Sequence, residues 1–234
     1  HDALPISNLF YTTLSVMSMS YWNNQGTFTD NTTFMSYDGT LKDRSTFGVY
    51  LSYDYVKLLY DFDATRMGNT SLKKGTEHDW YAVNARYMSS PIKAFTYSLT
   101  SRLGGYYGKG MRTGITADIG YRFQPYGSVS VALDYNDIVD VAIPGTDVMA
   151  AKKVSSNFWI IRPKIDITFS NKLFFATFFQ INQQTKNINL NARLQWRYKP
   201  ASDLFLVYTD NYFPEIMQIR NRAVVLKLNY WLNL

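Results

Sequence analysis

The segment from Asn187 to Lys199 alternates strictly between apolar and polar side chains. Successive side chains of a β-strand point to opposite faces, so the segment predicts a strand with one apolar and one polar face. At about 3.3 Å per residue the strand is about 40 Å long, and a tilt of about 45° reduces its span to about 28 Å. That span is close to the hydrocarbon thickness of a bilayer. The apolar positions are Ile188, Leu190, Ala192, Leu194, Trp196 and Tyr198.

Similar segments recur along the chain and predict about twelve strands. Pro163, in the middle of one of them, has no N–H group, so we expect a bulge or a sheet edge there. The range 46–63 reads either as one long strand or as a bent pair. The predicted strands are 9–22, 27–37, 46–63, 79–88, 93–103, 112–124, 128–137, 157–169, 173–182, 187–199, 203–212 and 220–234.

The predicted connections alternate in length. Short turns at 89–91, 125–127, 170–172 and 200–202 are separated by connections that are mostly longer, with 184–186 as the exception. Outer-membrane barrels have short periplasmic turns and longer extracellular loops. The sequence therefore predicts an all-β fold, an antiparallel up-and-down transmembrane β-barrel of about twelve strands. A soluble β-domain is the alternative.

Composition agrees with this prediction. Charged residues make up 18% of the chain, below the roughly 25% of soluble domains, and aromatic residues make up 17%. No apolar run approaches the roughly 20 residues of a membrane helix. The chain has no Cys, which excludes disulfides and thiolate metal sites. The net charge of +6 is scattered over the strands rather than clustered, so we do not expect a nucleic-acid partner.

The first seven residues differ in character from the rest. The run His1-Asp2-Ala3-Leu4-Pro5-Ile6 is what a sequencing-library adapter would encode, so we expect residues 1–7 to be an artefact. We expect residues 8–234 to form a single outer-membrane β-barrel domain, the C-terminal fragment of a longer protein. Strands missing before residue 8 would leave that barrel incomplete at its N-terminal side.

The C-terminal part also resembles a known family. The residues that carry the resemblance are 162–169 (RPKIDITF), 179–182 (FQIN), 190–210 (LNARLQWRYKPASDLFLVYTD) and 221–228 (NRAVVLKL), with weaker matches at 106–108 and 121–126. Over roughly 104–234 the chain is similar to the C-terminal barrel of a Gram-negative outer-membrane family catalogued as domain of unknown function 5916. Leu234 departs from the Phe or Trp that commonly ends a barrel-assembly signal.

The resemblance implies a location in the outer membrane of a Gram-negative cell. The expected partners are outer-membrane lipid and the barrel-assembly machinery. In this family the barrel usually follows a domain similar to family 9 carbohydrate-binding modules, which implies a carbohydrate partner for a longer protein. The resemblance carries no catalytic residue onto this chain.

Charged residues on the predicted polar faces are candidates to line a lumen. One interpretation is a basic pathway that favours anions; the other, which we favour, is a paired polar plug that fills a narrow barrel. The candidate lumen-lining residues are Arg86, Arg102, Arg112, Asp118, Arg122, Asp134, Arg162, Lys164, Asp166, Arg193, Arg197 and Lys227.

Exposed aromatic residues are candidates for belts at the two membrane interfaces, with sugar stacking as the alternative. The candidate interface residues are Trp159, Trp196, Tyr198, Tyr230 and Trp231.

No catalytic motif is present. His78 and Asp79 are adjacent on a predicted strand and point to opposite faces, which disfavours a catalytic dyad. Carboxylates near predicted loops (Asp61, Asp63, Asp134, Asp137, Asp140) lack the spacing of a known calcium loop, so solvated charges are favoured over a metal site.

We therefore expect no enzyme activity and no cofactor in this chain. The expected function is a membrane anchor or narrow pore for a longer, carbohydrate-binding protein. The alternatives are a hydrolase-type outer-membrane protein whose active or sugar-binding site lies in a missing N-terminal part, and a soluble glycan-binding β-domain.

Overall fold

The structure, a computed structural model, describes residues 8–68, 71–143, 152–216 and 218–232. The expectations for residues 1–7 and for Leu234 lie outside the described residues. Among the described residues, no helix has the length and apolarity needed to cross a bilayer.

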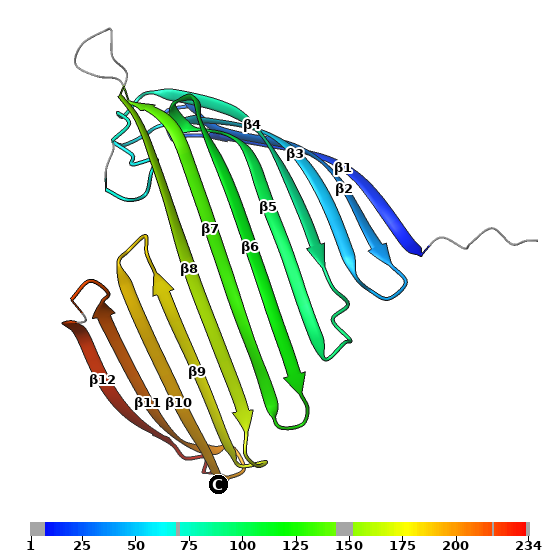
Figure 1. The fold of residues 1–234 in the computed structure, drawn as a ribbon, viewed down its shortest axis with the longest axis vertical. Helices are drawn as coiled ribbons and strands as arrows, with labels where there is room; N and C mark the ends of the chain where they lie inside the picture. Colours follow the sequence, from blue (N-terminus) through cyan, green and yellow to red (C-terminus); the bar gives the residue numbers. More distant parts are fainter. Residues whose placement is uncertain (1–7, 69–70, 144–151, 217, 233–234) are drawn as a thin grey trace, which may run out of the picture. The chain divides into compact units, whose positions relative to one another are not determined.

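Twelve strands form one antiparallel sheet in which each strand is hydrogen-bonded to the next along the chain (Figure 1). This confirms the predicted all-β, up-and-down arrangement. The strand order ends at β1 and β12, and closure of the sheet into a barrel is not seen in the described part of the chain. The strands are β1 (Leu9–Trp22), β2 (Phe28–Leu41), β3 (Thr46–Lys57), β4 (Glu77–Met88), β5 (Phe95–Tyr106), β6 (Gly110–Phe123), β7 (Gly127–Ile143), β8 (Lys152–Thr168), β9 (Leu173–Asn182), β10 (Asn187–Lys199), β11 (Ser202–Phe213) and β12 (Gln218–Asn229), with a short 3-10 helix η1 (Tyr107–Lys109).

Three predicted strands, β1, β9 and β10, have the predicted bounds, whereas others are longer or shorter. β3 ends at Lys57, so the prediction of a strand to residue 63 is wrong. β7 ends at Ile143 and β8 begins at Lys152, so both strands extend into the segment predicted as a loop.

Glycines caused two of the boundary errors. β2 continues through Gly39, because the missing side chain leaves room for the ring of Phe47 on the paired strand. β5 continues through Gly104, where a Cβ atom would stand 2.4 Å from the Cα of Ala82 on β4. Both glycines mark a close approach within a strand rather than a turn.

The expectation of a sheet edge at Pro163 is wrong, and no bulge is seen there in the pairing with β9. β8 lies between β7 and β9 in the sheet, so Pro163 is not at an edge. Ile161 pairs with Ile181 and Lys164 with Phe178, so the register with β9 is the same on both sides of the proline. A strand residue bonds through its N–H to one neighbour at most, so the missing donor interrupts one ladder without shifting the other.

The chain divides into two compact units, described here separately: unit 1 comprises 1–93, 98–117 and 135–158, and unit 2 comprises 94–97, 118–134 and 159–234. In unit 1 the register aligns the apolar positions of neighbouring strands. Met35 pairs with Leu51, Leu51 with Val83, and Val83 with Leu103, so these four side chains form one row on one face.

Aromatic pairs flank this apolar row in unit 1. Towards one end of the strands, the rings of Tyr37 and Phe47 lie 6.1 Å apart. Towards the other end, Tyr53 and Tyr81 lie 5.0 Å apart, and Tyr55 stacks on Phe28 at 5.2 Å. The apolar face is thus aliphatic in the middle and aromatic at both ends.

Unit 2 has the same two-faced organisation. On its apolar face, Phe175, Leu194, Leu206 and Leu226 form a row across β9 to β12. Its polar face carries a hydrogen-bonded set of amides and hydroxyls. The Nδ2 atom of Asn189 donates to Oδ1 of Asn211 at 2.5 Å, and Asn191 donates to Thr209 at 2.8 Å. Cross-strand pairs of this kind fix the register of a sheet.

Few apolar side chains of the described residues are buried. They are Leu58, Ala64, Leu72, Ala82, Tyr106, Ile138, Val141 and Phe158, all in unit 1. Large apolar side chains on the strands are instead exposed, for example Val16 at 72%, Leu226 at 68% and Leu51 at 53%. The apolar face of the sheet is therefore not covered by any other element of the described chain.

Candidate functional site

The connection between β3 and β4 contains a folded element, residues 58–68 and 71–76, that we call the cap. Phe62 and Leu72 form an antiparallel bridge with two backbone hydrogen bonds of 2.9 and 2.8 Å. The carboxylate of Asp63 accepts bonds from the N–H groups of Thr65 and Gly68, at 3.0 and 2.6 Å. Asp61 is paired with Lys73 at 2.8 Å. Two of the five carboxylates considered as calcium ligands, Asp61 and Asp63, thus hold the cap's own backbone and side chains.

The cap packs on the sheet of unit 1, beside the upper ends of β7 and β8 (Figure 1, cyan). The hydroxyl of Ser156 on β8 donates to the carbonyl of Thr65 at 3.2 Å. Leu58, Ala64 and Leu72 of the cap are buried, as are Ile138, Val141 and Phe158 of the strands. The buried apolar side chains of the described chain thus belong to the cap and to the strands of unit 1.

An aromatic cluster joins the cap to η1. The ring of Tyr107 lies 4.9 Å from Phe62 of the cap, 4.7 Å from Trp80 and 4.9 Å from Tyr106. Gly108, next in sequence, has φ +60° and lies so close to β7 that a Cβ atom would stand 2.5 Å from the carbonyl oxygen of Ala142. Only glycine fits this left-handed, crowded position.

His78 links the cap to η1. Its Nδ1 accepts a hydrogen bond from the N–H of Gly108 at 3.2 Å, and its Nε2 lies 2.9 Å from the hydroxyl of Thr76. Asp79 pairs across the sheet with Tyr55, on the opposite face from His78. The ring nitrogens of His78 thus have partners other than Asp79, and the two residues form no hydrogen-bonded dyad.

Burial among these rings raises the pKa of Tyr107 to about 12. Because an unfolded tyrosine ionises near pH 10, the contribution of the neutral phenol to stability is complete below about pH 10 and is lost as the pH rises to about 12. We expect Tyr107→Phe to remove part of the alkaline fall in thermal stability over this interval. Unfolding midpoints of both proteins between about pH 9 and pH 12 check this, and identical falls would contradict it.

Two of the candidate lumen-lining residues, Arg102 and Arg112, lie together next to the buried Tyr106. Their guanidinium carbons are 5.9 and 5.6 Å from the centroid of the Tyr106 ring. Arg102 donates to the carbonyls of Arg112 and Gly105 at 3.1 and 2.8 Å. Arg112 donates to Oδ1 of Asn136 through Nε at 3.1 Å and Nη2 at 2.7 Å. Among the described residues, neither arginine has a carboxylate within ion-pair distance.

The other candidate lumen-lining residues are mostly paired. In unit 1, Arg86 pairs with Asp38 at 3.2 Å and lies over the ring of Tyr50. In unit 2, Arg162 pairs with Asp134. Also in unit 2, Lys164 pairs with Asp166 at 2.8 Å and Arg197 pairs with Asp203 at 3.1 Å. Further polar-face positions on the strands of unit 2 are occupied by Asp118, Arg122, Arg193 and Lys227.

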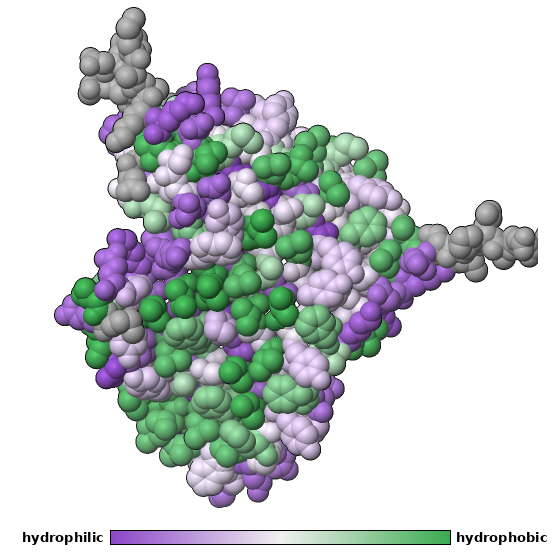
Figure 2. Space-filling view, viewed as in Figure 1, coloured by the Kyte–Doolittle hydropathy of each residue, from purple (hydrophilic) through white to green (hydrophobic). Residues whose placement is uncertain are grey.

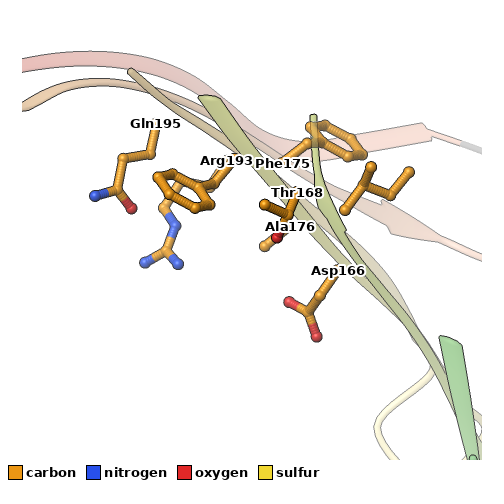
Figure 3. Close-up of a pocket in the computed structure, with 8 residues that line it drawn as sticks. Asp166, Thr168, Phe175, Ala176, Arg193 and Gln195 are labelled. Atoms are coloured by element: carbon orange, nitrogen blue, oxygen red, sulfur yellow. The ribbon is translucent and has the colours of Figure 1, made fainter. Parts of the chain in front are cut away.

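A hollow of about 220 Å³ lies in unit 2, between β8, β9 and β10. Asp166, Arg193 and Gln195 point to one side of these strands, and Phe175 points to the other (Figure 3). The hollow thus combines charges of both signs, and it is shallow and open.

The candidate interface aromatics lie towards two ends of the strands of unit 2. At one end, the ring of Trp196 is 5.9 Å from that of Tyr198, whose hydroxyl donates to the carbonyl of Asn229 at 3.0 Å. Tyr230 lies beneath Lys199 in the same region, and the N–H of Trp231 donates to Ser202 at 3.0 Å. Trp159 lies at the opposite end, where its N–H donates to Gln183 in the turn after β9.

One polar cluster was missed by the sequence analysis. Asp210 and Arg222 are directly paired across β11 and β12, on the apolar face of unit 2, and their side chains form an ion pair at 2.7 Å. Asp210 has no exposed surface and also accepts hydrogen bonds from the hydroxyls of Tyr208 and Tyr212, both at 2.5 Å. Both charges fall on even-numbered positions, which are otherwise apolar in these strands. That the two residues pair with each other becomes visible only once the register is known.

The buried phenol of Tyr106 was also missed, because its segment was read as a loop.

No family model, curated protein or solved structure matches this chain. In the part of the chain that the structure describes, no three His, Cys, Asp or Glu side chains are placed to share a metal ion.

Proposed function

We propose that this chain forms the wall of a membrane-spanning β-barrel. The observation that carries the proposal is the contrast between a small buried core and a continuous exposed apolar face. A water-soluble sheet of this size buries one face against another layer. Here the apolar rows of both units are exposed, so the medium that covers them is itself apolar.

The distribution of side chains along the strands supports lipid as that medium. Figure 2 shows hydrophobic residues gathered over the strands of the visible face and hydrophilic residues gathered near the loops. In unit 1, Phe47 at one end and Tyr53 and Tyr55 at the other flank the aliphatic positions of β3. Outer-membrane barrels likewise carry an apolar band between two aromatic girdles.

Within such a barrel the polar faces would line the interior. The ion pairs of Arg86, Arg162, Lys164 and Arg197 and the amides of β10 and β11 occupy these faces. The cap covers part of the polar face of unit 1. These contacts favour a filled interior, so we propose a membrane anchor as the main function of this chain.

A narrow pore is the second candidate, and one observation favours it. Arg102 and Arg112 lie beneath the cap without a carboxylate partner among the described residues. Uncompensated positive charge on the wall of a pore favours anions.

The wider setting follows from the resemblance noted in the sequence. We propose a location in the outer membrane of a Gram-negative cell, with lipid and the barrel-assembly machinery as partners. We also propose that the barrel serves a longer protein whose preceding part binds carbohydrate. A hydrolase-type function of that preceding part is the alternative, and it would leave this chain without a catalytic role.

Expression of the chain with an outer-membrane export signal in a Gram-negative host tests the proposal. We expect it to fractionate with the outer membrane, to require detergent for solubility, and to migrate as a compact band until boiled, because a folded barrel keeps its strands paired in detergent. A chain that stays soluble without detergent contradicts the proposal and favours the glycan-binding β-domain. A soluble periplasmic protein carrying the same signal is the control for export.

A further inference from the structure

Arg102 and Arg112 bring two like charges together in a half-buried site of unit 1. Both guanidinium groups lie against the same ring, that of Tyr106, at 5.9 and 5.6 Å. Arg66 of the cap adds a third positive charge that interacts electrostatically with Arg112. Clustered cations with little water around them repel one another unless negative charge compensates them.

Protein groups compensate this charge only in part. Asp54 is the carboxylate that interacts with Arg102, but its oxygens accept hydrogen bonds from Thr32 at 2.9 Å and Ser52 at 3.2 Å, not from the arginine. The acceptors that Arg102 and Arg112 do have are the neutral oxygens of two backbone carbonyls and Asn136. Each guanidinium has five N–H donors, so both retain donors beyond those bonds.

Tyr106 provides an independent observation. Its side chain is 3% exposed, and its hydroxyl is buried without a hydrogen-bond partner. A buried hydroxyl without a partner is costly, so native proteins nearly always satisfy one. The hydroxyl extends from the ring that both guanidinium groups flank, and it supplies an additional donor in a site already rich in donors.

Gly114 leaves space between these side chains. It follows Arg112 by two residues on β6, on the same face of the strand. A Cβ atom at this position would lie 3.6 Å from Oδ1 of Asn136 and 3.8 Å from Cβ of Arg102, at ordinary contact distances. A methyl group would thus fit here and would fill space beside the two arginines.

We propose that Arg102, Arg112 and Tyr106 form a binding site for a small oxyanion, of the size and charge of a phosphate group, beneath the cap. The guanidinium groups supply charge-assisted N–H donors and the phenol supplies an O–H donor, a combination that suits an anion with several acceptor oxygens. The inference rests on the proposed function in one respect: an anion would reach the site through the barrel interior. The binding itself depends only on the residues of unit 1.

Titration calorimetry of the full 234-residue chain with inorganic phosphate, at constant ionic strength with chloride as the reference anion, tests the site. We expect saturable binding to the folded protein, in detergent if the protein requires it. Arg112→Gln and Arg102→Gln should each weaken it about tenfold or more, because each removes a charged donor worth about 1.5–3 kcal/mol. Gly114→Ala should weaken it while leaving the fold intact, because its methyl group lies at ordinary contact distance from Asn136 and Arg102 and takes up space next to their polar groups.

Arg44→Gln is the matched control, because it removes the same charge from the exposed turn between β2 and β3, at the opposite end of β3 from the cap. It should change phosphate affinity by less than about twofold, since exposed charges are screened. Circular dichroism and unfolding midpoints establish that each variant is folded. If an arginine variant does not fold, Gly114→Ala decides the matter.

Absence of saturable binding to the folded wild-type chain overturns the site, as does an equal loss in Arg44→Gln. A chain that enters membranes but binds no phosphate overturns this inference and leaves the proposed function standing. A chain that binds phosphate but is soluble without detergent overturns the proposed function and leaves the site standing.

Discussion

Leu51→Lys is expected to destabilise the folded, membrane-inserted chain by about 2–4 kcal/mol, the cost of a lysine on the lipid face near the middle of a barrel strand. Leu51 lies in the middle of the apolar row of unit 1, between Met35 and Val83 on the neighbouring strands. In water the same change at a side chain already 53% exposed would cost little, because nothing buried is lost. The size of the effect therefore reports the medium that covers this face. Unfolding in urea from lipid bilayers measures it.

Ser52→Lys is the matched control, because it introduces the same charge one residue further along β3, on the opposite face. Asp54 lies two residues away on that face, so a lysine at position 52 has a carboxylate within reach. We expect a cost below about 1 kcal/mol, the usual range for polar surface changes. Similar small costs at both positions would place both faces in water and contradict the barrel proposal.

Leu72→Ala is expected to detach the cap from unit 1. Leu72 is 1% exposed, and truncation of a buried leucine costs about 2–5 kcal/mol through lost apolar contact and the cavity left behind. The cap is held mainly by this small core, by the Ser156–Thr65 hydrogen bond and by the Phe62–Tyr107 contact. This loss of stability is large relative to the energy of those contacts. The readout is trypsin cleavage after Lys73 and Lys74, which requires the cap to open.

Leu59→Ala is the control for the cap, since Leu59 belongs to the same connection and is 48% exposed. It should change the cleavage rate by less than about twofold, because no cavity forms. If the cap closes a pore, Leu72→Ala should also raise the conductance of planar bilayers that contain the protein, and Leu59→Ala should not. Equal cleavage of both variants would show that the buried leucine does not hold the cap.

The strands and their order could be predicted from the sequence because alternation is a local property. The strand at 187–199 has the predicted bounds because apolar and polar residues alternate along its whole length. Two of the boundary errors arose where glycine carried two meanings: Gly39 and Gly104 look like turn residues, but each leaves room for a neighbouring strand. Which of these meanings applies depends on the partner strand, which local sequence does not specify.

The candidate site was only partly predictable. Arg102 and Arg112 were identified from alternation, because both fall on the polar face of their strands. The cap was not recognised as one element, because residues 58–63 were assigned to the preceding strand and the rest to a loop. Its buried leucines are separated by polar residues and have no period. Tyr106 and the Asp210–Arg222 pair depend on register and burial, which appear only when the strands are paired.

The cap also has a consequence for the order of assembly. Every strand pairs with its sequence neighbour, so the sheet can grow hairpin by hairpin with short chain closures at each step. The hydrogen bond between Thr65 and Ser156 joins residues 91 positions apart, so it forms only after β8 has been added. Until then the cap lacks this contact with β8. The connection is made early in synthesis, but its contact with β8 forms late, so a chain interrupted before β8 would hold the cap less firmly and should be cleaved faster after Lys73 and Lys74.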